Sequence, residues 1–107
     1  MVGETEQSLT AKKVPYVAGR ASYAGNARGT IIGDRAGLLK LVFAADGLKL
    51  LGAQMIGEQA TELIHVGLTA LETGATADLF VRMCFNFPTL AETYKYAAYD
   101  ALGKAGR

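Results

Sequence analysis

The sequence predicts an α+β domain in which an antiparallel β-sheet is covered by helices on one side. Two observations carry this prediction. The first half of the chain shows strand-like alternation around an Asp-Gly turn, and the second half shows apolar residues at helical spacing with capping signals. Strands that precede the helices, instead of alternating with them, are typical of this class. A chain of 107 residues suffices for one core, so residues 1–107 are expected to form a single domain.

The clearest strand signal is the stretch GLLKLVFAADGLKLLGAQMIG. In an extended chain Leu39, Leu41 and Phe43 share one face, and Lys40 marks the other. The Asp-Gly pair at 46–47 supplies the positive φ angles of a tight hairpin turn. The predicted strands are 15–23, 37–45 and 48–56, the last with a bulge at Gly52.

Helical spacing begins after the hairpin. From Gln59 to Thr73 apolar residues fall on one helical face, and Gly74 ends the pattern. Thr76 is expected to cap a short helical turn, and a last helix is expected after Pro88. The predicted apolar faces are Ala60, Leu63, Ile64, Gly67, Leu68 and Leu71 in the first of these helices, and Leu90, Tyr94, Ala97, Ala98 and Ala101 in the last.

Before the first strand, the stretch TEQSLTAKK is expected to form a short helix. Thr5 would cap it, with Glu6 in the first turn. Lys12 and Lys13 would then lie in its last turn, where the helix macrodipole favours positive charge.

Composition and charge exclude several classes of function. Half of the residues are hydrophobic, a fifth are charged and the net charge is +1, so no field for nucleic acid or anionic membrane is expected. Arg20, Arg28 and Arg35 are interpreted as part of a solvated, glycine-rich loop. The longest apolar run, 38–45, is far shorter than the ~20 residues of a membrane helix. We therefore expect a soluble protein without nucleic-acid or membrane partners.

The chain has one cysteine and one histidine. Cys84 alone can form no internal disulfide, and no signal peptide is evident, so we expect a reduced, cytoplasmic protein in which Cys84 is buried. A metal site needs three or four ligands, so none is predicted. His65 lacks a recognisable nucleophile partner and is interpreted as an exposed or interface side chain. No catalytic residue is assigned.

The stretch CFNFPTLAE, residues 84–92, has the pattern of a helix start. Thr89 and Glu92 match the T-x-x-E capping box, and no adjacent group would let Glu92 act as a general acid or base. Glu92 is therefore interpreted as a cap. Tyr94, Tyr96 and Tyr99 point to more than one side of the last helix, so some of them are expected to face another protein surface.

Three segments resemble, in order, the C-terminal dimerisation domain of the pyridine nucleotide-disulfide oxidoreductases, the FAD flavoproteins that include glutathione reductase. They are VGETEQSL, GLLKLVFAADGLKLLGAQMIGEQATELI and CFNFPTLAETYKYAAYDAL. The resemblance implies a homodimer, with FAD- and NAD(P)-binding domains upstream of Met1 in the same polypeptide. This segment alone would bind no cofactor, since no two of its glycines have the G-x-G spacing of a dinucleotide site.

One position departs from the family pattern. Disulfide-reducing members carry a histidine before the proline, paired with the glutamate, whereas this chain has Phe87, which cannot exchange a proton. The stretch is similar to the soluble transhydrogenase branch, which passes hydride between NADPH and NAD through FAD. The resemblance also implies a cis Phe87–Pro88 bond and a cofactor-binding role for Phe87 and Pro88, with the carbonyl before the proline accepting from the partner subunit's flavin.

Two alternatives stay open at this point. One is a non-enzymatic homodimerisation module, and the other is the same domain from a disulfide reductase that lacks the usual histidine. In each case we expect self-association through a face that contains Phe85, Phe87 and the last helix, because one small core cannot cover so many aromatic side chains.

Overall fold

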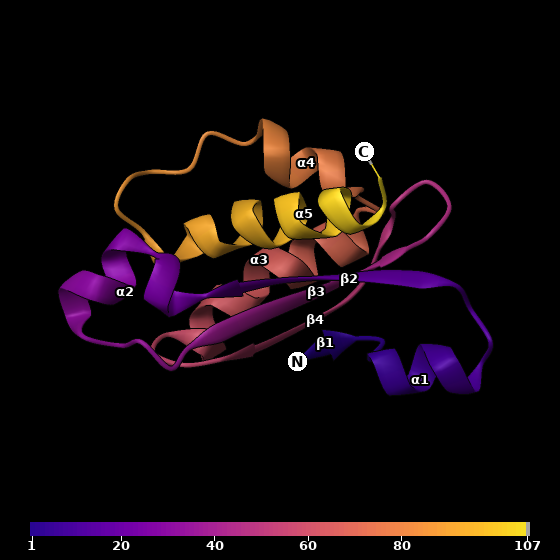
Figure 1. Cartoon of the computed structure of the whole chain (residues 1–107), viewed down its shortest axis with the longest axis horizontal. Coiled ribbons are helices and arrows are strands. Elements are labelled where there is room, and N and C mark those ends of the chain that lie inside the picture. The colour runs from indigo at the N-terminus through magenta and orange to yellow at the C-terminus, as the bar shows by residue number, and fades with distance from the viewer. Residues whose placement is uncertain (107) are drawn as a thin grey trace.

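The computed structural model describes residues 1–106 and confirms the α+β class. A four-stranded antiparallel sheet, in the order β1-β4-β3-β2, packs against helices (Figure 1). The strands are β1 (Val2–Gly3), β2 (Tyr16–Ser22), β3 (Leu38–Ala44) and β4 (Leu50–Ile56). The α-helices are α1 (Glu6–Ala11), α2 (Ala27–Ile32), α3 (Ala60–Glu72), α4 (Ala77–Arg82) and α5 (Thr93–Lys104), and the 3-10 helices are η1 (Tyr23–Gly25) and η2 (Leu90–Glu92).

The core lies between the sheet and the helices α3, α4 and α5. Alternation along β3 turns Leu39, Leu41 and Phe43 to this side, and all three are fully buried, as predicted. The predicted inner stripe of η2 and α5 is also buried. Helix α5 comes so close to β2 that a Cβ atom on Gly19 would overlap the carbonyl oxygen of Ala97. Glycine at position 19 therefore permits this close packing.

The hairpin of β3 and β4 has an irregular register near the predicted bulge. Val42 pairs with Gly52 and Phe43 pairs with Leu50, so the additional residue is Leu51 and not Gly52. Gly52 has a different role, since a Cβ atom there would overlap the backbone carbonyl of Glu4. The edge strand β1, which the sequence pattern did not predict, runs beside this position.

Helix α1 begins as predicted but ends earlier. The Thr5 hydroxyl accepts a hydrogen bond from the Ser8 amide at 3.0 Å. Lys12 and Lys13 lie beyond the last helical residue, so they do not occupy the last turn of the helix. Lys12 forms an ion pair with Glu4 instead, at 2.7 Å.

Charged side chains attach α1 to the sheet face opposite to α5. The Glu6 carboxylate contacts Arg20 at 2.9 Å and Lys40 at 2.8 Å, and these two residues are partners across β2 and β3. The hydrogen bond from Lys40 is the main cause that lowers the pKa of Glu6. A short helix is thereby held over the face that carries Lys40.

The segment between β2 and β3 forms the helix α2, where a solvated loop was predicted. The Asn26 side chain caps its start, and Gly33 ends it in the left-handed conformation with a φ of 80°. Arg28 therefore lies on a helix and Arg20 on a strand, while Arg35 lies in the connection to β3.

The helices of the second half follow the prediction with three corrections. Helix α3 begins after Gln59, yet Leu68 of the predicted apolar face is 37% exposed. Thr76 precedes α4 but makes no side-chain capping bond. Cys84 is exposed and not buried, because in the connection between α4 and η2 the residues on either side of it, Met83 and Phe85, are the ones that pack against the core. His65 is exposed on α3, in agreement with its interpretation.

None of the helices in residues 1–106 has the length and apolar character that crossing a membrane requires.

Candidate functional site

Residues 83–89 connect α4 to η2, and we call this connection the proline loop. Figure 1 shows it as the orange segment that extends outward before the chain enters α5. The Phe87–Pro88 peptide bond is cis, as the family resemblance implied. Phe87 is 75% exposed. Its carbonyl oxygen accepts no hydrogen bond from the residues that the structure describes, so the loop presents a free acceptor.

Thr89, the residue after the proline, is held at three of its polar groups. Its amide donates to Oε1 of Glu92 at 3.2 Å, which is the capping bond that the sequence predicted. Its hydroxyl donates to the carbonyl of Asn86 at 2.8 Å. Its carbonyl accepts from Nδ2 of Asn26 at 2.9 Å. The end of the proline loop is therefore fixed by one contact within the loop, one to η2 and one to the cap of α2.

Asn26 is the residue of this site that sequence reasoning missed. Its side chain is buried and bridges two elements, because Oδ1 accepts from the Gly29 amide at 3.0 Å while Nδ2 reaches Thr89. Asparagine is favoured at helix caps, and Gly33 follows where a helix would end. This local signal could have predicted α2 and the cap. The contact with Thr89 spans 63 residues and has no local signature.

A groove of about 420 Å³ lies beside the proline loop. It runs between α2, the start of α3 and residues 88–91, and Arg28 and Glu62 are its charged side chains. Gln59, at the start of α3, also lines it and adopts a left-handed conformation with a φ of 63°. The groove brings together three segments that are far apart in the sequence.

The side chains of Tyr23 and Asp34 hold the turn that precedes α3 by hydrogen bonds to the backbone of Glu58. The Tyr23 hydroxyl donates to the carbonyl of Glu58 at 2.7 Å, and Asp34 Oδ2 accepts from the Glu58 amide at 2.9 Å. Burial is the main cause that raises the pKa of Tyr23, and the bond from the Glu58 amide is the main cause that lowers the pKa of Asp34. The backbone next to Gln59, which lines the groove, is therefore held by hydrogen bonds.

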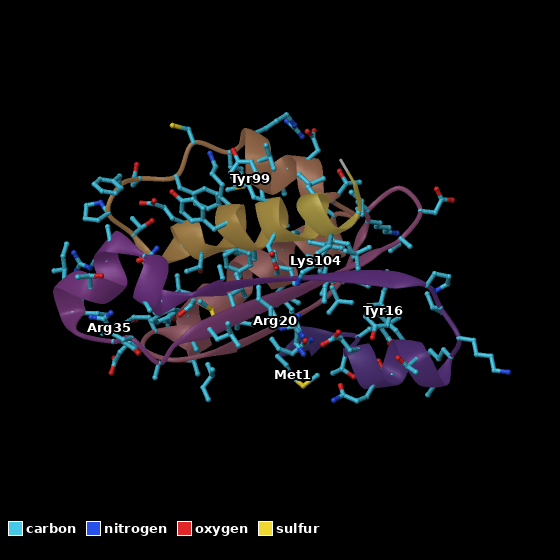
Figure 2. All side chains as sticks on the ribbon, viewed as in Figure 1. Met1, Tyr16, Arg20, Arg35, Tyr99 and Lys104 are labelled. Carbon is cyan, nitrogen blue, oxygen red and sulfur yellow. The ribbon has the colours of Figure 1, made fainter. Side chains whose placement is uncertain are left out.

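The proline loop and α5 carry aromatic side chains that are partly or largely exposed, of which Phe85 also packs against the core. We call Phe85, Phe87, Tyr96 and Tyr99 the aromatic face. Tyr96 and Tyr99 are 51% and 48% exposed, with ring centroids 6.4 Å apart, whereas Tyr94 is fully buried. Figure 2 shows Tyr99 on the side of α5 that lies away from the sheet. The prediction that the tyrosines point to different sides of the last helix is therefore confirmed.

The two groups that the sequence analysis weighed for proton transfer, His65 and Glu92, are engaged in local contacts. The ring Nδ1 of His65 lies 3.0 Å from the Glu62 carbonyl within its own helix, and the Glu92 carboxylate binds the Thr89 amide. Among residues 1–106, no three His, Cys, Asp or Glu side chains are grouped so that they could hold a metal ion. What the site offers is a backbone acceptor at Phe87 that no donor of the described residues occupies, in a loop that also carries two phenylalanines.

The fold and the site define an α+β domain with one antiparallel sheet and a proline loop held by contacts from two helical segments. Residues 1–98 match the family model for the pyridine nucleotide-disulphide oxidoreductase dimerisation domain. The chain belongs to this family.

Relatives of known name align along almost the entire chain. The soluble pyridine nucleotide transhydrogenase of Serratia proteamaculans is 46% identical over 106 residues, and that of Mycobacterium bovis is 44% identical over 103 residues. Each alignment covers 96% of this chain but only 23% and 22% of the respective relative. The chain therefore spans less than a quarter of the length of these enzymes.

Solved structures share the fold at low sequence identity. The HOCl-induced flavoprotein disulfide reductase RclA from Escherichia coli superposes with a TM-score of 0.86 at 19% identity, over 92% of this chain and 22% of that chain. LpdA from Mycobacterium tuberculosis gives a TM-score of 0.86 at 21% identity, over 92% of this chain and 21% of its own. At these identities the likeness shows the fold alone.

Proposed function

We propose that this chain is the dimerisation domain of a longer homodimeric flavoprotein that transfers hydride between NADPH and NAD. The FAD- and NAD(P)-binding domains would lie upstream in the same polypeptide. The observation that carries the proposal is the proline loop, where the Phe87 carbonyl has no donor among the described residues and the side chain before the proline cannot exchange a proton. The similarity to soluble transhydrogenases along the chain supports it.

In the dimer the proline loop is offered to the flavin of the other subunit, and Phe87 and Pro88 are the cofactor-binding residues. A carbonyl without a donor among the described residues fits a flavin ring, which carries an N–H group that needs an acceptor. FAD, when bound, supplies the carrier that takes hydride from one nicotinamide and gives it to another. The chain's own part is to hold the acceptor in place through Thr89.

The side chains around the loop favour hydride transfer over disulfide reduction. Reduction of a disulfide needs a group that moves a proton to and from the thiols, and phenylalanine at position 87 has none. The Glu92 carboxylate accepts from the Thr89 amide and has no imidazole beside it in the loop. Hydride transfer between nicotinamide and flavin requires no acid at this segment.

The test uses the full-length protein that carries this chain, purified with its flavin. It should oxidise NADPH while it reduces a thionicotinamide analogue of NAD, and it should not reduce an aromatic disulfide at a comparable rate. Phe87→Ala should retain the flavin, because the substitution leaves the backbone carbonyl in place. A protein without flavin, or one that reduces the disulfide faster than the nicotinamide analogue, would refute the proposed function.

A further inference from the structure

We propose that Asn26 is a positioning residue for the flavin contact, which it controls through the carbonyl of Thr89. This inference rests on the proposed function and deepens it. The Asn26 side chain donates to Thr89, one residue beyond Pro88, and not to Phe87 or Pro88, the residues that would contact the flavin. It would act by fixing where the Phe87 carbonyl lies.

The first support is the geometry of the contact. Nδ2 of Asn26 lies 2.9 Å from the Thr89 carbonyl oxygen, and only 3% of the Asn26 surface is exposed. A buried side-chain amide is held firmly by its hydrogen-bond partner. If that bond broke, the amide N–H would have neither water nor a protein acceptor to bond to. Peptide planes are rigid, so an anchored Thr89 limits the rotation of the planes on its N-terminal side. The anchor is therefore two peptide units from the Phe87 carbonyl.

The second support is that the two atoms of the Asn26 amide have separate tasks. Oδ1 accepts from the Gly29 amide and caps α2, while Nδ2 donates to Thr89. A residue that only capped the helix would need the oxygen alone, and aspartate or serine would serve as well. Asparagine differs from both in that it carries an acceptor and an N–H donor on separate atoms, which a serine hydroxyl combines in one atom. The donor is what connects α2 to the proline loop.

The remaining contacts of Thr89 make the position testable. The Glu92 carboxylate and the Asn86 carbonyl would still hold its amide and hydroxyl if the bond to Asn26 were lost. Loss of the Asn26 donor should therefore loosen the loop without unfolding it. The variant Asn26→Asp removes the donor, keeps the capping oxygen and turns a carboxylate oxygen toward the Thr89 carbonyl.

The experiment compares the full-length flavoprotein with its Asn26→Asp, Asn26→Ser and Thr5→Ala variants. Thr5 is the matched control, since it caps α1, away from the proline loop. Both Asn26 variants should exchange the amide hydrogens of the proline loop about fivefold faster, as expected when one hydrogen bond is lost. They should also change the visible absorption of the flavin and lower kcat about tenfold, with little change in KM, because a reacting group is displaced. Thr5→Ala should show none of these effects.

The outcomes separate the two proposals. If wild type contains FAD and transfers hydride, but both Asn26 variants keep its exchange rates and flavin spectrum, Asn26 is only a cap and the inference is wrong. If Asn26→Asp does not fold, Asn26→Ser decides by the same two readouts. If wild type binds no FAD, the proposed function fails, and the assignment of Asn26 to a flavin contact fails with it.

Discussion

The hydroxyl of Tyr94 forms two hydrogen bonds with the backbone of helix α3 at Gly67 and Leu63. It accepts from the Gly67 amide at 3.1 Å and donates to the carbonyl of Leu63 at 2.7 Å. These are the two groups that pair with each other in a regular α-helix. The absence of a side chain at position 67 leaves room for the ring, since a Cβ atom there would lie 3.2 Å from the Tyr94 hydroxyl. Backbone groups of helix α3 are therefore hydrogen-bonded directly to a side chain of α5.

Removing this hydroxyl should cost little stability. In Tyr94→Phe the amide of Gly67 and the carbonyl of Leu63 lose the hydroxyl but can bond to each other, so neither is left unpaired. We expect unfolding to become easier by about 1 kcal/mol, the usual net value of such bonds. Urea unfolding followed by circular dichroism measures this, with Tyr99→Phe as the control at a half-exposed tyrosine. A loss several times larger would show that the two backbone groups stay without a partner in Tyr94→Phe.

The same residue predicts a dependence on alkaline pH. Burial raises the pKa of Tyr94 from 10.0 to about 12, so the folded protein holds this proton more tightly than the unfolded chain. The stabilisation that comes from this tighter proton binding is fully present below pH 10. It is lost as the pH rises toward 12, which lowers the free energy of unfolding by on the order of 2 kcal/mol. The stability of wild type should therefore fall more steeply across this range than that of Tyr94→Phe. Thermal melts at several pH values measure this. If stability falls equally with pH in wild type and Tyr94→Phe, the raised pKa of Tyr94 is wrong.

Local patterns in the sequence were sufficient for most of the fold. The alternation at Leu39, Leu41 and Phe43 predicted the buried face of β3, because burial of one sheet face imposes a period of two. The spacing of apolar residues predicted α3 and α5, and Thr89 with Glu92 predicted the start of the last helical segment. In each case the residues that carry the signal lie within a few positions of one another.

Contacts between distant segments could not be predicted in this way. The bond between Asn26 and Thr89 depends on how α2 packs beside the proline loop, and no spacing in the sequence encodes it. Cys84 was expected to be buried, but it is exposed, while its neighbours Met83 and Phe85 pack against the core. The candidate site was therefore located by its motif, while the contacts that hold it were found only in the structure.

The ion pairs of Glu6 predict a small dependence on acidic pH. The hydrogen bond from Lys40 is the main cause that lowers the pKa of Glu6 below 4.5. The stabilisation by the ionised Glu6 is therefore present above pH 4.5 and is lost as the pH falls through the lowered pKa. Glu6→Gln should lower stability at pH 7 by no more than about 1 kcal/mol, because partly exposed pairs are screened. The difference from wild type should shrink at pH 3, whereas Glu72→Gln, at an exposed position of α3, should match wild type throughout. A difference that persists at pH 3 would exclude the ionic explanation.

The aromatic face predicts where two copies of the chain meet. Phe87 is 75% exposed and two tyrosines of α5 accompany it, an arrangement typical of interfaces between proteins. We expect the chain to self-associate at micromolar concentration and expect Phe87→Ser with Tyr99→Ser to weaken association at least tenfold. Ile56→Ser is the control, because Ile56 is 67% exposed but lies at the end of β4. Sedimentation equilibrium measures each variant, and association that only the Ile56 change weakens would place the interface elsewhere.

Glu92 offers the sharpest distinction between a structural and a chemical role. Its carboxylate accepts from the Thr89 amide at 3.2 Å, and a glutamine oxygen can accept the same bond. If Glu92 is only a cap, Glu92→Gln should keep both stability and hydride transfer in the full-length enzyme. Glu92→Ala should lose about 1 kcal/mol of stability, because the amide is left without its partner.

The opposite result is expected if Glu92 moves protons. Glutamine has the shape of glutamate without the ionisable group, so Glu92→Gln would then be as damaging as Glu92→Ala, and loss of a general acid or base typically slows a reaction by 10²–10⁴-fold. We expect the cap, because Phe87 provides no imidazole for the carboxylate to orient and hydride transfer at the flavin needs no acid in this loop. Unfolding curves measured beside steady-state transhydrogenation separate the two cases. A Glu92→Gln enzyme with normal stability and a hundredfold lower rate would return Glu92 to the active site.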